Sequence, residues 1–315
     1  MVFAMLVRLP PLSRNAPVRH LKVMAFTTHP FHEGEREIQR RAGVAAEAEA
    51  VGRIIASTIS PAVHRFLAGQ RMAVAASLDA RGQPWASLVT GRAGFLEAVD
   101  ERLLRIGSGP PPDDVLTANL RARPELGLLV LDPRTRQRVR INGRGLLRPE
   151  GVFLLADEVY GNCPKYIQKR RLVGEAEGRS AARPVRSRRL DARQRKILAA
   201  ADTFFIASFH AGGGADASHR GGRPGFVRVE DGGRIAFPDY PGNNMFNTLG
   251  NLAGYPKVGL LFVDFATGDL LQVAGRASVP DRPERCVQVR VEEVRETRNG
   301  SPLRWELIEY SPALP

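Results

Sequence analysis

Cysteine is scarce in this sequence, and long apolar runs are missing. Cys163 and Cys286 are the only cysteines among 315 residues, and neither has a partner at the spacing of zinc sites or redox motifs. This excludes a disulfide-stapled secreted scaffold and favours a reducing cytoplasm. No apolar run reaches the roughly 18 residues of a membrane-spanning helix. We therefore expect a cytoplasmic protein without a membrane partner.

The first residues also lack a targeting pattern. The apolar run that begins at Met1 is short, is broken by Pro10 and Pro11, and is followed by no small-residue cleavage site. We expect residues 1–30 to form a poorly ordered extension, with Met24 as an alternative start.

Lysine is scarce too, although the formal net charge is +13. Almost all basic residues are arginine, which codon usage explains as easily as a selected surface does. A strong positive charge is typical of nucleic-acid binders, but no basic strand face rich in aromatic residues is present. An arginine-rich nucleic-acid binder is therefore the least favoured function. We expect the arginine cluster at 179–195 to be a solvated linker.

What the sequence does contain is a long internal repeat. Residues 119–132 and 251–264 share the frame N-L-x-x-x-P-x-x-G-L-L-x-x-D at an offset of 132 residues. The match extends upstream, where Ser87 and Arg92 correspond to Ser218 and Arg223 at an offset of 131. A unit this long is a whole domain, so the repeat predicts two similarly folded domains in tandem.

The patterns within each copy predict strands flanked by helices. Residues 35–67 have helical spacing, with a break at Gly43 and an end at Ser60-Pro61. Short apolar runs separated by turn residues then predict antiparallel strands. In the first copy they lie at 72–78, 85–89, 103–106, 126–131 and 139–147, and in the second at 204–209, 225–229, 234–237, 258–263 and 270–279.

Helices are expected at two further places in each copy. Between the third and fourth strands of each copy lies a segment that ends in the shared Asn-Leu, at 110–120 and 239–252. A short helix is expected at its end, and Asn244 or Asn247 can cap the helix of the second copy. Charged segments at 157–171 and 292–307 are expected to form closing helices. The predicted fold is mainly β with flanking helices (α+β), a tandem duplication of an antiparallel split β-barrel. Its parts are 31–178, the linker at 179–195, and 196–315.

This series resembles the pyridoxamine 5'-phosphate oxidase-like superfamily of FMN-binding split β-barrels. It is most similar to the branch of predicted flavin-nucleotide-binding proteins. The residues that carry the resemblance are Phe31–Arg36, Tyr160–Gln168, Ala201–Ile206, Ser218–Val227 and Phe237–Leu252. The resemblance implies FMN as cofactor, a flavin site between two barrels, and therefore an internal pseudo-dimer that can pair further into a homodimer.

The resemblance also implies the site residues. Arg223 should open the second barrel strand and hold the FMN phosphate, with Pro224, Gly225, Phe226 and Val227 along the flavin edge. The family's basic triplet at the helix start falls on Phe246, Asn247 and Thr248, so backbone amides at this bend would replace two cations. Further expected contacts are Ser218, His219, Asn243, Asn244 and Gln272, with Lys165 and Tyr166 from the first copy as the opposite wall.

Several of these residues have a plainer alternative. Arg223 can be a surface ion-pair partner, and the asparagines are turn formers in most proteins. His210, Asp216 and His219 could be drawn as a metal site, but residues flanking a glycine turn are usually solvated, so no metal site is expected.

The first copy is less suited to a phosphate. Its loop contains three prolines at 110–112, which remove amide donors, and Asp113 and Asp114, which repel an anion. We therefore expect one FMN per chain. The favoured function is an FMN-dependent oxidoreductase that exchanges electrons with an unidentified small molecule. The alternative is a non-catalytic flavin-binding or sensory module.

Overall fold

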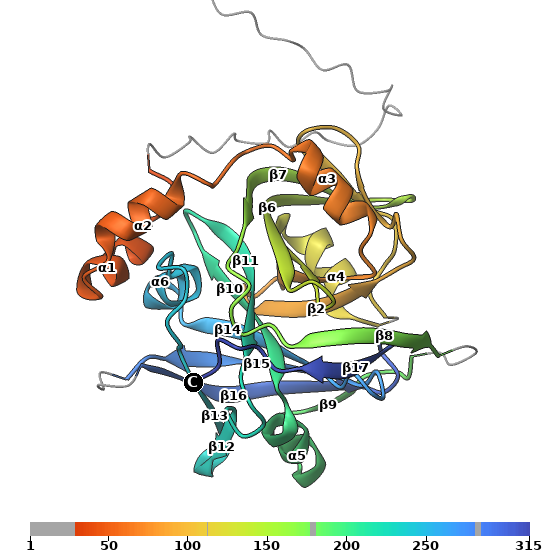
Figure 1. Cartoon of the computed structure of the whole chain (residues 1–315). Coiled ribbons are helices and arrows are strands. Elements are labelled where there is room, and N and C mark those ends of the chain that lie inside the picture. Colours follow the sequence, from red (N-terminus) through yellow and green to blue (C-terminus); the bar gives the residue numbers. More distant parts are fainter. Residues whose placement is uncertain (1–28, 112, 177–180, 281–284) are drawn as a thin grey trace, which may run out of the picture.

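The structure is a computed structural model that describes residues 29–111, 113–176, 181–280 and 285–315. The extension expected at 1–30 lies outside these ranges except for His29 and Pro30. Among the described residues, six α-helices accompany three antiparallel sheets (Figure 1). The helices are α1 (Glu33–Arg41), α2 (Ala45–Gly52), α3 (Pro61–Ala68), α4 (Val115–Ala122), α5 (Ala192–Ala200) and α6 (Asn247–Gly254), and a 3-10 turn, η1, spans Asp231–Gly233.

The first half of the chain forms a seven-stranded sheet with the order β2-β1-β5-β6-β7-β4-β3. Its strands are β1 (Met72–Leu78), β2 (Pro84–Thr90), β3 (Leu96–Ala98), β4 (Leu103–Ile106), β5 (Glu125–Asp132), β6 (Gln137–Arg148) and β7 (Gly151–Gly161).

The second half repeats this order strand for strand, as β11-β10-β14-β15-β16-β13-β12. Its strands are β10 (Thr203–His210), β11 (Gly214–Gly221), β12 (Arg228–Glu230), β13 (Arg234–Pro238), β14 (Lys257–Val263), β15 (Leu270–Ser278) and β16 (Cys286–Thr297). Even the register shift recurs, after Asn142 on β6 and after Ala274 on β15. β9 (Val185–Ser187) adds to β16, and β8 (Lys169–Glu175) pairs with β17 (Leu303–Glu309) in a separate ribbon.

Both faces of the central strands are buried, which fixes how the halves pack. On β1, Ala73 and Ala75 face the core of the first half, whereas Val74 and its alternate neighbours face a core shared by the two halves. On β10, Phe204 faces the second core and Phe205 the shared one. Successive residues of a strand point to opposite faces, so each strand serves two cores. The shared core joins the halves along β1, β5, β10 and β14.

Two glycines at matching positions allow this close packing. A Cβ at Gly127 on β5 would lie 2.4 Å from the carbonyl oxygen of Ala215, and one at Gly259 on β14 would lie 2.5 Å from that of Pro84. Each glycine lets its strand pass directly against the backbone of the opposite half.

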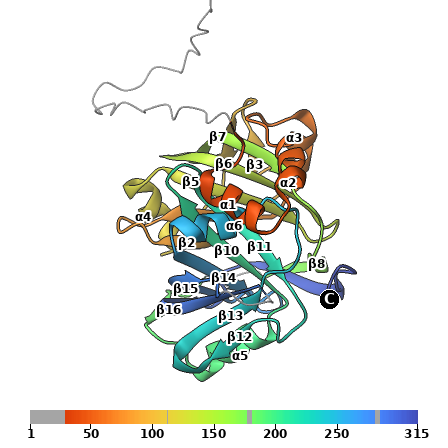
Figure 2. The ribbon, with the colours of Figure 1, turned by 90° about the vertical axis from the view of Figure 1, so that its left-hand side faces the viewer.

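Helix α1 crosses the contact between the halves and lies on α6 (Figure 2). It begins with a capping box, because His32 accepts from Gly34 N while Glu35 accepts from His32 N. His32 Nε2 lies 2.8 Å from Asn251 Oδ1, and Gln39 donates to the carbonyl oxygen of Met245. None of the helices in the described part of the chain combines the length and apolar character needed to cross a bilayer.

The sequence-based elements need three corrections. Ser60 and Pro61 begin α3 instead of ending a helix, since the Ser60 hydroxyl caps Val63 N and proline suits the first turn. The segments expected as closing helices, 157–171 and 292–307, contain strands instead: 157–161 completes β7, 169–171 begins β8, 292–297 ends β16, and 303–307 lies in β17. The second strand of the second half is β11, not 225–229.

The segment expected as a linker, 179–195, contains β9 and the start of α5.

Candidate functional site

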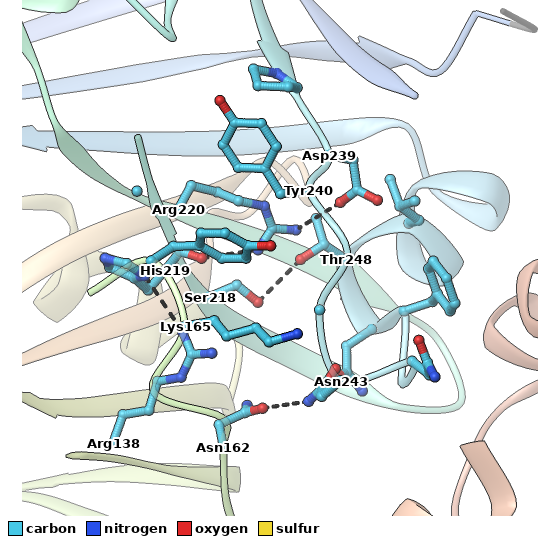
Figure 3. A pocket seen from close by; sticks show the side chains of 18 of the residues that line it. Arg138, Asn162, Lys165, Ser218, His219, Arg220, Asp239, Tyr240, Asn243 and Thr248 are labelled. Carbon is cyan, nitrogen blue, oxygen red and sulfur yellow. Dashed lines mark hydrogen bonds and ion pairs between the residues drawn. The ribbon is translucent and has the colours of Figure 1, made fainter. Parts of the chain in front are cut away.

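A polar pocket lies where the end of the first half meets β11 and α6 of the second half (Figure 3). Residues of β6 and the turn after β7 form one wall, and residues of β11 and the bend before α6 form the other. The lining side chains include Arg138, Arg140, Asn162, Lys165, Tyr166, Ser218, His219, Arg220, Phe226, Asp239, Tyr240, Asn243, Asn244, Phe246, Asn247 and Thr248.

The bend before α6 leaves the helix start open. Asn244 and Phe246 have left-handed backbone angles, with φ of 63° and 59°, a conformation that costs energy for residues other than glycine. The N-cap is Phe246, and no side chain among the described residues caps the first turn, so neither Asn244 nor Asn247 caps the helix. Amides of a first helical turn have no partner inside the helix and attract anions.

Arg138 and His219 meet inside the pocket with unused nitrogen atoms. Arg138 Nη1 lies 3.5 Å from His219 Nδ1. Arg138 Nε and His219 Nε2 are buried and have no hydrogen-bond partner among the described residues. Burial, aided by neighbouring Arg140, lowers the pKa of Arg138 to about 9, and burial with the surrounding arginines holds the pKa of His219 well below its usual value. Positive charge is under-compensated here.

Arg220 adds a third basic group. Its closest carboxylate is Asp239 at 3.9 Å, which Arg285 shares at 3.4 Å. Arg220 Nε is buried without a partner in the described chain, and burial lowers the pKa of this guanidinium. An anion placed between Arg138, His219 and Arg220 would restore the balance of charge.

Ser218 lies at the junction of the two halves. Its hydroxyl oxygen accepts from Arg140 Nη2 at 2.7 Å and from Thr248 Oγ1 at 3.1 Å. Since the oxygen accepts both bonds, its own hydrogen is left to donate to a ligand. Arg140 itself is tied to Asp216 at 3.1 Å, and although burial opposes its charge, Asp216 outweighs this and raises the pKa of Arg140.

The mouth of the pocket is aromatic. Tyr166 donates to the carbonyl oxygen of Pro241 at 2.8 Å, and its ring lies 5.3 Å from that of Tyr240. Lys165 extends its amino group toward the middle of the pocket (Figure 3).

Ten of the fifteen expected site residues line this pocket: Lys165, Tyr166, Ser218, His219, Phe226, Asn243, Asn244, Phe246, Asn247 and Thr248. Arg223, Pro224, Gly225 and Val227 do not. Arg223 follows β11 in a turn, is exposed, and places its guanidinium 5.0 Å from the centre of the Tyr310 ring. Gln272 lies at a different site in the contact between the halves.

Three arginines of the pocket were missed from the sequence. Arg138 and Arg140 alternate with Val139 and Ile141, which are buried in the core of the first half. That alternation of arginine with apolar residues was the available signal, since it places both guanidiniums on one face of β6. Arg220 lies two residues after Ser218 on β11, and this spacing likewise places both side chains on one face of the strand. What stays hidden in the sequence is that β6 of one half faces β11 of the other.

Gln272 belongs to the equivalent site of the first half, and that site is filled by the chain itself. The carboxylate of Asp114 caps α4 by accepting from Leu116 N. It also accepts from Ser87 Oγ at 2.6 Å and from Gln272 Nε2 at 3.0 Å. Ser87, Gln272 and α4 correspond to Ser218, Arg140 and α6. The Asp114 side chain therefore fills the space beside Ser87 and Gln272, at the counterpart of the Ser218–Arg140 junction.

Two of the three residues that could be drawn as a metal site are not solvated, contrary to expectation. Asp216 and His219 are buried, and His210 stacks on His32 with ring centres 3.7 Å apart.

Comparison with known proteins places the chain in a family. The family model described as pyridoxamine 5'-phosphate oxidase matches residues 59–159 and 190–302, together more than half of the chain. The chain therefore belongs to this family, and each matched segment covers one of the two large sheets. No curated protein matches the chain.

Several solved structures match about one third of the chain each. HupZ of Group A Streptococcus is 14% identical with a TM-score of 0.27, and the match covers 33% of this chain and 90% of HupZ. The FAD binding protein of Mycobacterium smegmatis is 13% identical with a TM-score of 0.25, covering 36% and 97%. The heme storage protein HutZ of Vibrio cholerae is 12% identical with a TM-score of 0.25, covering 33% and 91%.

Proposed function

We propose that this chain is a flavoprotein that binds one FMN in the pocket between its halves, with the phosphate against the start of α6. The observation that carries the proposal is the set of buried nitrogens on Arg138, His219 and Arg220, which lack partners among the described residues and line one pocket with the open helix start. Basic side chains and free amides around one cavity are the donors that a dianionic phosphate takes.

The residues present fit the phosphate of FMN. Arg138 and Arg220 would hold it in the role first expected for Arg223, with Lys165 as a third cation and the Ser218 hydroxyl as a neutral donor. Phe226, Tyr166 and Tyr240 supply the aromatic surface that a flavin ring needs. When bound, the flavin would supply electron transfer to and from a second small molecule.

The pocket is large enough to enclose the phosphate but not the whole FMN molecule. Its cavity volume is about 100 Å³, whereas a ligand of drug size takes about 300 Å³ or more. The phosphate fits the enclosed part. The flavin ring requires the mouth, and the Tyr166 hydrogen bond to Pro241 would have to open to admit it.

The matching sheets and the two family segments support a duplication, so that the chain is an internal pseudo-dimer of two split β-barrels. Its flavin site would then be one of two equivalent sites. The other has been closed by Asp114, which supports a stoichiometry of one FMN per chain.

The experiment is an absorption spectrum of the purified protein, with mass spectrometry of the molecule that heat releases. Flavin absorption and the mass of FMN are expected. A different cofactor, or none after incubation with FMN, would contradict the proposal. Steady-state assays with reduced nicotinamides and oxygen then distinguish an oxidoreductase from the alternative, a flavin-binding module whose cofactor does not turn over.

A further inference from the structure

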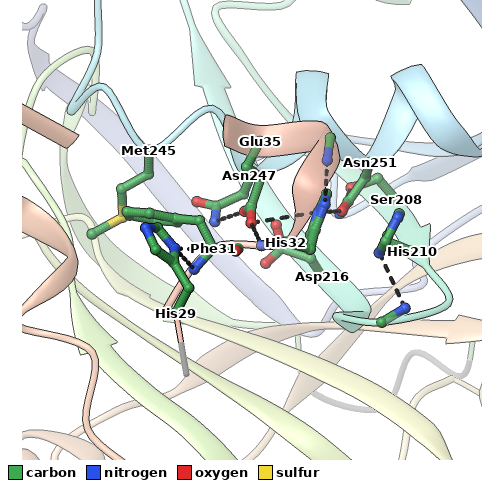
Figure 4. A network of polar contacts seen from close by, with 12 residues as sticks. His29, Phe31, His32, Glu35, Ser208, His210, Asp216, Met245, Asn247 and Asn251 are labelled. Atoms are coloured by element: carbon green, nitrogen blue, oxygen red, sulfur yellow. Dashed lines mark hydrogen bonds and ion pairs between the residues drawn. The ribbon is translucent and has the colours of Figure 1, made fainter. Parts of the chain in front are cut away.

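A second cavity lies beside the pocket, under helix α1. Its lining is acidic, whereas that of the pocket is basic. It has a volume of about 40 Å³ and is lined by Pro30, His32, Glu35, Asn142, Glu158, Gly212, Gly213, Asp216, Asn247 and Asn251. Figure 4 shows Glu35, Asp216 and Asn247 gathered beside His32, and Asn247 lines both cavities. A volume of this size holds one group about as large as a water molecule, which takes roughly 30 Å³.

Three carboxyl groups surround this cavity. Glu35 and Asp216 are 5% and 3% exposed. Burial raises the pKa of Glu35 to about 8 and that of Glu158 to about 7, and it raises the pKa of Asp216 as well. The charged side chain that contacts them is Arg140, which bonds to Asp216.

The neighbouring residues do not supply more positive charge. Burial, with His210 beside it, lowers the pKa of His32 to about 4, and burial lowers the pKa of His210 too, so both rings are neutral near pH 7. Tyr160, on the same side as Glu158, has its pKa raised by burial and is neutral as well. The cavity therefore has three acids against one guanidinium.

Hydrogen bonding at the cavity favours the ionised form of these acids. Glu35 Oε2 accepts from His32 N at 2.9 Å, and Glu35 Oε1 accepts from Asn247 Nδ2 at 2.6 Å. Each accepted hydrogen bond is stronger to the ionised carboxylate and so favours that form. Burial thus favours the neutral form of these carboxyl groups, whereas hydrogen bonding favours the ionised form. A cation beside them would offset the cost of burying the ionised form.

An unused acceptor provides an independent indication. Asn142 is 5% exposed, and its amide nitrogen donates to Glu158 Oε2 at 3.1 Å. Its Oδ1 atom is buried and has no partner among the described residues. A group that satisfies this oxygen must be a donor. A positively charged donor would also offset the charge of the surrounding carboxyl groups when they are ionised.

We propose that this cavity binds a small ammonium-type cation, the ammonium ion or a primary ammonium group of similar width. A metal ion would require oxygen ligands within about 2.0–2.6 Å, and no three His, Cys, Asp or Glu side chains of the described residues are placed to hold one. Ammonium N–H donors bond at about 2.7–3.2 Å and suit a looser set of acceptors. The proposal does not depend on a flavin in the neighbouring pocket.

The test is thermal unfolding of the full chain at about pH 8.5, where the carboxyl groups are ionised. Ammonium chloride and methylammonium chloride are compared with tetramethylammonium chloride at equal ionic strength. At saturation, we expect the first two to raise the midpoint by about 2–4 °C over the third. The rise should shrink at about pH 6, where Glu35 and Glu158 are protonated. Equal midpoints in all three salts would overturn the proposal.

Variants identify the cavity as the site of the effect. Glu35→Gln and Asp216→Asn should abolish the ammonium-specific rise, while Glu37→Gln, on the exposed side of the same helix, should keep it. A rise that persists in both cavity variants would also overturn the proposal. If either variant fails to fold, ¹⁵N-ammonium NMR of the wild-type protein decides. Bound ammonium that methylammonium displaces and tetramethylammonium does not supports the site, and absence of a bound signal refutes it.

Discussion

Arg140 and Gln272 occupy equivalent positions on β6 and β15, and each reaches across to a polar site of the opposite half. Arg140 Nη2 donates to Ser218 Oγ at 2.7 Å, while Gln272 Nε2 donates to the carbonyl oxygen of Ala86 at 2.9 Å and to Asp114. The two sites thus differ: one is rich in cations and open, and the other is closed by a carboxylate. Because only one of the two sites is open, we expect one ligand per chain.

Asp114→Ala should lower stability without creating a second ligand site. The substitution removes the N-cap of α4 and leaves Gln272 Nε2 with one partner fewer, which together cost about 1–3 kcal/mol. Chemical denaturation measures the loss. FMN titration of the variant should still reach one equivalent, because Gln272 is neutral where the open site has Arg140; two equivalents would show that Asp114 alone closes the site.

Arg223→Ala should leave FMN affinity within about twofold of wild type, since Arg223 is exposed and lies outside the pocket lining. Arg92→Ala, at the corresponding position of the first half, is the matched control. The measurement is quenching of FMN fluorescence. A tenfold loss in Arg223→Ala alone would return the phosphate to the residue expected from the sequence.

Gly127→Ala and Gly259→Ala should each destabilise the fold by about 1–3 kcal/mol or more, because the added Cβ would overlap a backbone carbonyl oxygen of the other half. Gly174→Ala is the control, since a Cβ there meets nothing within 4 Å. Urea unfolding compares the three. Loss of stability confined to Gly127→Ala would contradict the matched packing of the two halves.

Stability should fall as pH rises toward 8 in buffers free of ammonium. Glu35 has its pKa raised from 4.5 to about 8 in the folded state, so its stabilising contribution is complete below about pH 4.5 and is lost as pH passes 8. The slope for this one group reaches at most about 1.4 kcal/mol per pH unit. His32 acts in the opposite direction, but only below about pH 6.5. Glu35→Gln should therefore flatten the decline above pH 6.5 in denaturation series.

The strands β1, β2, β4, β5 and β6 and the helices α4 and α6 could be predicted from the sequence, because turn residues and short apolar runs mark them. The strands β3 and β7 could not, and neither could the closing segments. In β16, Val287, Val289 and Val294 are buried, but the strand is rich in charged residues, among them Arg290, Glu293 and Glu296, which obscure the period of two. Glu296 is held by Arg193 and Gln194 of α5, contacts that exist only in the folded chain.

The location of the pocket could be predicted in part. Lys165, Ser218 and the bend before α6 follow from the family pattern, and the expected wall from the first half is present. Arg138 and Arg220 become site residues only when β6 lies against β11, a contact between the halves that spacing along the chain does not encode. The resemblance places the family's strand arginine on Arg223, but Arg223 lies in the turn after β11.

The most direct test compares FMN with riboflavin, which lacks the phosphate, in equilibrium titrations of the wild type and of Arg138→Ala and Arg220→Ala. Each charge-assisted bond contributes about 1.5–3 kcal/mol, so wild type should prefer FMN by at least about 100-fold. Each variant should lose most of that preference while keeping its affinity for riboflavin. Equal affinity of the wild type for FMN and riboflavin would contradict a phosphate seat in this pocket.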